Sequence, residues 1–519
     1  MHRLNLLLSV TYSWRMYIVC FCLLVITVPA YFSKTHFLLN LEPYPDGLLY
    51  TETARNLILT GQQGLVYRDS FIPIWVPPLY SYILLPGYLI SLNPNSFYII
   101  NILLLICTFL LFDRLLFVFT RKKWLHLAAL IVFAAHGYLI WQTLLPMTEN
   151  AALPIFLIIL IGLLHRTKLS PVLVSVGTVA LVLCRYSALS IAGSEVILVL
   201  TSLLPKLSNR KKIVKASAIL VSVFAFISFL YVTRSNYSVY RAIFSEPPPG
   251  EAYYGLSFFF RNLKAYVISL SGISGVFLWK HAALSSFLVL LPGLWYIIDQ
   301  ISHKSKKALV IAILAGGVLL APLIFYVVDD RYIILLVPLL VLSFTGFIDK
   351  TSEKHNTLSK FFVGITIVSL FFVQRNIYKE LIVANFLDRS TAWQYQAIKH
   401  FDTTLSQGDY VITALPPHLV SAYQKQLYTV LPISNYQEFL QTGYEIWGSE
   451  PNYKDLKAGY SEMLEEGKTL YISNSYITHQ QSVIKDYEAY KELFNFELVS
   501  EGCLSACNIY KLSLKPPKE

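Results

Sequence analysis

Long apolar stretches recur along the first 375 residues of this 519-residue chain, and they limit its possible folds more than any other feature. A helix that crosses the hydrocarbon core of a bilayer needs roughly 20 mostly apolar residues. Stretches close to that length predict about 11 transmembrane helices, at residues 16–33, 96–120, 124–141, 147–164, 171–187, 188–204, 213–232, 282–298, 308–328, 332–347 and 361–373. The composition, 55% hydrophobic and 14% charged, agrees with a polytopic α-helical membrane protein.

Basic residues predict the orientation of these helices, because cytoplasmic loops retain Lys and Arg near the helix ends. With the N-terminus in the cytoplasm, every predicted inner loop is basic, through Arg121, Lys122, Lys123, Arg166, Lys168, Lys206, Arg210, Lys211, Lys212, Lys215, Lys304, Lys306, Lys307, Lys350, Lys354 and Lys360. Merging the fifth and sixth stretches would move the cluster at 206–215 outside, so we expect two short helices there. The same loops explain the net charge of +11 without a nucleic-acid partner. An odd number of spans places the C-terminus outside, together with the segments 34–95 and 233–281.

From about Ile377 the sequence becomes polar, which predicts a transmembrane domain over 1–376 and a soluble extracytoplasmic domain over 377–519. Local patterns indicate strands at 410–414, 427–431, 469–472, 496–499 and 509–512, and helices at 391–405, 456–466 and 480–493. Alternating strands and helices are typical of a small α/β sandwich. It contains no glycine-rich phosphate loop, so we expect no nucleotide there. Cys503 and Cys507 either form a disulfide that closes a short loop or remain free.

The first external segment contains two patterns with local structure. A Pro-Asp-Gly turn at 45–47 precedes apolar residues that recur at helical spacing from Tyr50 to Ile58. They predict a short amphipathic helix on the membrane surface, ended by Gly61. Downstream, a Pro-Pro-Leu sequence at 77–79 opens an apolar stretch that we expect to dip into the interface without crossing it.

The order of these motifs resembles that of the GT-C glycosyltransferases. Asp46 stands at the head of the first external loop, a Tyr-x3-Ala helix and the Pro-Pro-Leu turn follow, and Arg331-Tyr332 opens a later proline-containing span. The resemblance covers most of the chain. It is closest to the branch of protein O-mannosyltransferases and the lipid A aminoarabinose transferase, which take a sugar from a polyprenyl-phosphate carrier. One departure is Val76, where the aminoarabinose transferase branch tends to have Lys.

The resemblance implies catalytic roles for two carboxylates. Asp46 corresponds to the first-loop carboxylate of the family, which accepts the proton of the attacking acceptor hydroxyl. The alternative is an N-cap of the surface helix, and the two roles are compatible. Glu149 matches an acidic residue of the second external loop, where it would orient the acceptor or cap the following helix. If a divalent metal ion is required, Asp46 and Glu149 are its expected ligands.

Four basic residues are candidates for binding the donor phosphate, whose negative charge grows as the sugar leaves. Arg331 matches the Arg-Tyr element of the family, and Arg185 resembles an Arg found in these enzymes. Lys280 and Arg55 are the remaining two. The alternatives are a local ion pair of Arg331 with a neighbouring Asp, and snorkelling of Arg185 and Lys280 to the interface.

The leading function is therefore an inverting glycosyltransferase that moves a sugar from a polyprenyl-phosphate donor to a hydroxyl or phosphate of a protein, lipid or glycan. It would act at the external face of a bacterial or archaeal plasma membrane. One competitor is a transporter or flippase of lipid-linked sugars, for which Asp113 and Glu195 are ionisable residues within spans. The other is a non-catalytic membrane scaffold.

Overall fold

The computed structural model describes residues 46–67, 70–73, 77–92, 96–164, 169–203, 255–273, 283–325, 328–382, 393–415, 420, 424–426, 428–433, 456–475, 481–502 and 506–516. They fall into two compact units. The helical unit includes Leu41–Ile58 and Trp75–Asp388, and the second unit includes Leu59–Ile74 and Arg389–Glu519. The spans predicted at 16–33 and 213–232 lie outside the described residues.

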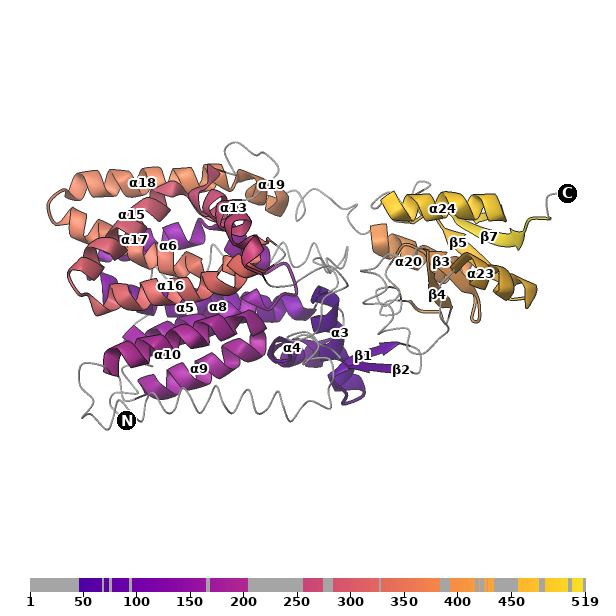
Figure 1. Ribbon diagram of the computed structural model, residues 1–519, viewed down its shortest axis with the longest axis horizontal. Helices are drawn as coiled ribbons and strands as arrows, with labels where there is room; N and C mark the ends of the chain where they lie inside the picture. The colour runs from indigo at the N-terminus through magenta and orange to yellow at the C-terminus, as the bar shows by residue number, and fades with distance from the viewer. Residues whose placement is uncertain are drawn as a thin grey trace. The chain divides into compact units, whose positions relative to one another are not determined.

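The helical unit is a set of packed α-helices (Figure 1). Its α-helices are α3 (Asp46–Leu59), α4 (Leu79–Ile90), α5 (Phe97–Phe119), α6 (Lys123–Ala134), α7 (Gly137–Gln142), α8 (Glu149–Leu164), α9 (Ser170–Cys184), α10 (Leu189–Leu203), α13 (Phe259–Ser271), α15 (Phe287–Ser302), α16 (Lys306–Ile324), α17 (Leu336–Ser352), α18 (Asn356–Val373) and α19 (Arg375–Ile382). Short 3-10 helices are η2 (Tyr186–Ala188), η4 (Leu256–Phe258) and η5 (Asp330–Ile333).

Three of these helices, α5, α16 and α18, are long and apolar enough to cross a membrane by length and composition. One face of α18 exposes large apolar side chains, with exposed fractions of 66% for Phe361, 68% for Val368 and 56% for Phe372. Such a face is stable against lipid and costly against water. The chain is therefore an integral membrane protein.

Two predicted spans show how local backbone breaks arise. The fifth and sixth are separate helices as predicted, because Arg185 between α9 and η2 is extended (φ −149°, ψ 119°). The third, predicted as one helix, is instead broken into α6 and α7 at His136. There the Tyr378 hydroxyl donates to the Ala135 carbonyl at 2.9 Å, which replaces a lost helical hydrogen bond. The Tyr378 ring lies so close to Gly137 that an added Cβ would be 2.8 Å from it.

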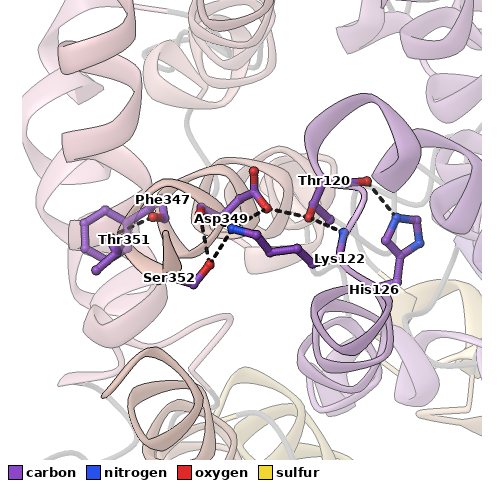
Figure 2. Close-up of polar contacts among 7 residues, drawn as sticks. All are labelled: Thr120, Lys122, His126, Phe347, Asp349, Thr351 and Ser352. Carbon is purple, nitrogen blue, oxygen red and sulfur yellow. Dashed lines mark hydrogen bonds and ion pairs between the residues drawn. The ribbon is translucent and has the colours of Figure 1, made fainter. Parts of the chain in front are cut away.

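A polar cluster joins the C-terminal end of α17 to the loop between α5 and α6 (Figure 2). Lys122 Nζ donates to the Asp349 carbonyl oxygen and to Ser352 Oγ, both at 2.8 Å. It also lies 3.4 Å from the Asp349 carboxylate, to which Thr120 Oγ1 donates at 2.6 Å. Residues from two predicted inner loops therefore meet at one end of the helices.

Two more predicted inner-loop residues make contacts at the same end. Lys307 Nζ donates to the Val118 carbonyl oxygen at 2.6 Å, and Lys350 pairs with Asp299 at 2.8 Å. From this basic end, the 19 residues of α16 extend to Ile324. That is about 28 Å at the usual helical rise, close to the thickness of a bilayer core. The far ends of these helices therefore lie about one membrane thickness from the basic loops.

The first external segment contains the predicted helix. The helix α3 ends at Leu59, and Gly61 follows with the left-handed φ of +72° that terminates helices. Residues 49–54 of α3 are all buried, so this part of the helix packs against protein on every side, whereas the sequence predicted an amphipathic helix on the membrane surface. The next helix, α4, has 12 residues and is about 18 Å long, too short to cross a bilayer.

The second unit contains a five-stranded mixed sheet in the order β4-β3-β5-β7-β6 (Figure 1). Its elements are α20 (Trp393–Thr404), β3 (Tyr410–Thr413), β4 (Thr429–Pro432), α23 (Leu456–Glu465), β5 (Leu470–Ser473), α24 (Gln481–Leu493), β6 (Phe494–Ser500) and β7 (Ile509–Leu514). Each overlaps the strand or helix predicted for that part of the sequence. A hairpin of β1 (Gly64–Tyr67) and β2 (Ser70–Pro73) was not predicted.

Both faces of this sheet are covered at β3. Adjacent residues Val411 and Ile412 of β3 point to opposite faces, and both are fully buried. The core on the Ile412 side includes Tyr460 of α23 and Tyr490 of α24. Cys507 is disulfide-bonded. Because Cys503 lies outside the described residues, its pairing with Cys507 stays a prediction.

Candidate active site

Three of the predicted site residues meet where α8, α9 and η5 come together. Glu149 is the first residue of α8, and Arg185 follows the last residue of α9. Arg185 Nη1 lies 3.2 Å from Glu149 Oε1, and the two side chains are 7% and 2% exposed. A buried charge of this kind is stable when it has an opposite partner. Arg185 is therefore paired and does not snorkel to the interface.

Arg331 joins this pair from η5. Arg185 Nη1 also donates to the Arg331 carbonyl oxygen, at 3.3 Å. The Arg331 guanidinium pairs with Asp329, with 2.9 Å between Nε and Oδ2, so the local ion pair considered from the sequence is present. Asp329 Oδ1 accepts a hydrogen bond from the Arg331 backbone N–H, which fixes the start of η5. Two cations and two anions thus form one connected network.

An aromatic ring completes the surroundings of the two arginines. The Tyr332 ring centroid lies 5.8 Å from the Arg185 guanidinium carbon and 5.0 Å from that of Arg331. Such distances give a favourable cation–π contact. Arg331 Nη2 also donates to the Tyr332 hydroxyl at 3.1 Å.

Burial raises the pKa of Asp329 above its usual value, and the neighbouring Arg331 partly offsets that rise. Desolvation disfavours the charged carboxylate, whereas a nearby cation favours it. The larger influence here is burial. Asp329 therefore binds a proton more readily in the folded protein than in an unfolded chain.

Two buried asparagines hold the loop that precedes Glu149. Asn101 Nδ2 donates to the carbonyl oxygens of Thr143 and Leu145, at 3.1 and 2.9 Å. Asn150 Nδ2 donates to the Leu145 carbonyl as well, at 2.9 Å. Loop carbonyls buried without such donors would be costly, so these side chains fix the path of the loop. The signal available in the sequence was the amide of Asn101 inside an apolar stretch, and the prediction missed it.

Tyr80 connects this loop to the helix that begins at Asp46. Its hydroxyl donates to Asn101 Oδ1 at 2.7 Å, and its ring meets the edge of Tyr50 at a centroid distance of 5.4 Å. Tyr50 lies one helical turn after Asp46, the first residue of α3, on the same helix face. The backbone thus places Asp46 near the element that fixes the Glu149 loop. Its roles as base and as N-cap stay predictions.

Of the remaining candidates, Arg55 pairs with Glu52 of the same helix at 2.7 Å, and Lys280 lies outside the described residues. Among the residues that the structure describes, His, Cys, Asp and Glu form no group of three or more that could hold a metal ion. Metal binding by Asp46 and Glu149 stays a prediction.

The ionisable residues considered for transport have their own partners. Glu195 of α10 is fully buried and accepts a hydrogen bond from Thr178 of α9. Asp113 of α5 lies 3.8 Å from His126 of α6. Each contact joins two neighbouring helices of the bundle.

No protein-family model matches the sequence, and no curated protein matches it. Solved structures do share its fold. ArnT from Cupriavidus metallidurans in the apo state has a TM-score of 0.61 at 13% identity, covering 96% of this chain and 98% of that chain. The same protein bound to undecaprenyl phosphate has a TM-score of 0.61 at 12% identity, covering 94% of this chain and 96% of that chain.

The archaeal oligosaccharyltransferase AglB from Archaeoglobus fulgidus, in complex with an inhibitory peptide and a dolichol-phosphate, is also similar. Its TM-score is 0.50 at 11% identity, covering 94% of this chain and 74% of that chain. The resemblance predicted from the sequence is thus confirmed at the level of the fold, which this chain shares with ArnT and AglB.

Proposed function

We propose that this chain is an inverting glycosyltransferase that transfers a sugar from a polyprenyl-phosphate donor to a hydroxyl or phosphate of a protein, lipid or glycan acceptor. The observation that carries the proposal is the pair of arginines, buried Arg185 and partly buried Arg331, joined at one end of the helix bundle. It occurs in a fold that also binds undecaprenyl phosphate in ArnT.

The chemistry of the transfer suits these residues. As the bond between the sugar and the carrier phosphate breaks, negative charge grows on the phosphate. Arg185 and Arg331 are guanidinium groups that pair well with phosphate oxygens in a site with little water. Asp46 would accept the proton of the acceptor as it attacks the anomeric carbon from the opposite side, which inverts the configuration.

The arrangement of the helix ends supports transfer on the extracytoplasmic face. Arg185 follows α9, and Arg331 precedes α17. Three lysines lie at the other end of α16 and α17, namely Lys122, Lys307 and Lys350. Basic loops are retained in the cytoplasm. The N-terminus is then cytoplasmic, and the C-terminal α/β domain is extracytoplasmic, in the plasma membrane of a bacterium or archaeon.

The direct test is transfer of radiolabelled sugar from a polyprenyl-phosphate hexose by purified protein in lipid nanodiscs, over a panel of acceptor extracts. Asp46→Asn keeps the shape of the side chain and removes its basicity, so turnover should fall by about 10²- to 10⁴-fold. Arg331→Ala should reduce turnover by about 10²- to 10³-fold. Arg375→Ala, which removes a cation that contacts Phe372 at the start of α19, is the matched control and should keep wild-type turnover.

The outcomes separate the competing functions. Loss of turnover in Asp46→Asn with intact folding and donor binding supports the transferase with Asp46 as the base. Donor binding without any turnover in the wild type would favour a transporter or a scaffold. Equal activity of wild type and Arg331→Ala would contradict the proposed phosphate site.

A further inference from the structure

Each arginine of the candidate site is neutralised by a carboxylate of the chain itself. Arg185 lies 3.2 Å from Glu149, and Arg331 lies 2.9 Å from Asp329. The Arg185–Glu149 pair is the more deeply buried of the two. A phosphate that enters the site therefore meets arginines that already have anionic partners.

Carboxylate and phosphate compete for the same guanidinium hydrogens. A carboxylate and a phosphate can each offer two oxygens to one guanidinium, and both form short charge-assisted hydrogen bonds with Arg. Nη1 of Arg185 contacts Glu149 and also donates to the Arg331 carbonyl oxygen. A phosphate can gain this nitrogen when the Glu149 carboxylate gives it up.

We propose that Glu149 is an internal anion that occupies the phosphate position at Arg185 and is displaced when the donor binds. This rests on the proposed function, because it assigns Arg185 to the donor phosphate. It gives Glu149 a role in selecting the donor: the incoming group must be anionic enough to replace a carboxylate, and a neutral lipid headgroup is not.

The displaced carboxylate has a stable position available to it. Glu149 is the first residue of α8, where backbone N–H groups have no helical acceptor and the helix dipole favours negative charge. Thr148 Oγ1 already donates to Glu149 Oε2 at 3.3 Å. Glu149 can therefore leave Arg185 while its charge stays compensated, and Arg185 keeps an anionic partner throughout.

The test compares two variants that free one arginine each. Glu149→Gln keeps the shape of the side chain and removes the anion that holds Arg185. Glu52→Gln does the same to Arg55 on α3, whose pair spans 2.7 Å, and is the matched control. Binding of undecaprenyl phosphate, and of undecaprenol as the uncharged probe, is measured for the full-length protein in nanodiscs, with thermal unfolding to verify folding.

If the donor phosphate exchanges places with the Glu149 carboxylate at Arg185, Glu149→Gln should bind undecaprenyl phosphate about tenfold more tightly than wild type, because the competing carboxylate is gone. Glu52→Gln should bind like wild type, and undecaprenol binding should not change in either variant. Adding Arg185→Ala to Glu149→Gln should abolish the gain in affinity for undecaprenyl phosphate.

Three results would overturn the exchange. Wild-type binding with no gain in folded Glu149→Gln would reject it while leaving the proposed function intact. A gain confined to Glu52→Gln would move the phosphate site to Arg55. Failure of every folded variant to bind undecaprenyl phosphate would reject the proposed function, and the exchange with it.

Discussion

The helical unit and the C-terminal α/β unit differ in the kind of polar group that they bury. Among the described residues, the fully or nearly fully buried acidic and Arg side chains are Glu52, Glu149, Arg185 and Glu195, all of the helical unit. The C-terminal core is built from aliphatic and tyrosine side chains, such as Tyr460, whose hydroxyl donates to the Pro432 carbonyl at 2.5 Å. Buried charge costs stability unless it is paired, so its concentration in one unit points to where the chemistry takes place.

Removing one arginine of the site should produce the largest effect. Arg185→Ala leaves Glu149 buried without its cation, which should cost about 3–5 kcal/mol of stability. Thermal unfolding in nanodiscs measures this loss, and the double variant Arg185→Ala/Glu149→Ala should recover much of it. If the single variant were as stable as wild type, the pair would not be a buried charge pair in the membrane.

Replacing the amide that holds the Glu149 loop should be the next largest effect. Asn101→Leu leaves the Thr143 carbonyl without its side-chain donor and the Tyr80 hydroxyl without its acceptor, whereas the Leu145 carbonyl keeps the hydrogen bond from Asn150. The expected loss is about 2–4 kcal/mol, at about 1–3 kcal/mol for each group left unpaired. Sugar transfer should fall as well, because the loop positions Glu149. A stable variant with full turnover would contradict the role of this amide.

Two glycines test whether both units are packed equally tightly. A Cβ at Gly346 would lie 2.4–2.8 Å from the Tyr296 ring in the helical unit, and one at Gly502 would lie 2.6–2.8 Å from the His400 ring in the C-terminal unit. Gly346→Ala and Gly502→Ala should each destabilise by about 1–3 kcal/mol. Unfolding of the full-length variants measures both. Gly408→Ala would be a poor control because its φ is +91°, whereas Gly364→Ala meets no atom within 4 Å and should be neutral by comparison.

The smallest expected effects are opposite pH dependences in the two units. Burial raises the pKa of Asp329, so the folded helical unit binds a proton there more tightly than the unfolded chain. The contribution of Asp329 to the free energy of unfolding therefore increases as the pH falls from the raised pKa towards the ordinary value of about 4. Asp329→Asn should remove that rise, seen in hydrogen exchange of peptides from η5 and α17.

In the C-terminal unit the sign reverses. Burial lowers the pKa of His400, so the unfolded chain binds a proton there more tightly. Stability from this group is lost as pH falls from about 6.5 to the lowered pKa and does not change further below it. His400→Gln should flatten this loss in hydrogen exchange of α20 peptides. An unchanged pH profile would show that other groups control the acid response.

Local patterns in the sequence were enough to predict most elements of both units. The strands and helices of the C-terminal unit follow alternation and helical periodicity, which depend on residues close in sequence. The same holds for α5, α16 and α18, where apolar length is sufficient. The break at His136 was missed, because the carbonyl at Ala135 is satisfied by Tyr378, which lies 243 residues later.

Individual residues of the candidate site could also be predicted from the sequence. Glu149, Arg185 and Arg331 were each predicted as site residues, and the pairing of Arg331 with a neighbouring Asp was one of the alternatives considered. The pairing of Arg185 with Glu149 was not predicted, nor were the amide contacts of Asn101. No local spacing encodes them.

The sequence by itself therefore determined apolar helices such as α5, α16 and α18 and the strands and helices of the α/β unit, and it pointed to Glu149, Arg185 and Arg331 as candidate site residues. Periodicity and apolar length act within one segment, so they can be read along the chain. The tertiary structure decided which polar groups meet, such as Arg185 with the Arg331 carbonyl 146 residues away. That choice depends on how helix ends pack together and on the cost of leaving a charge buried without a partner.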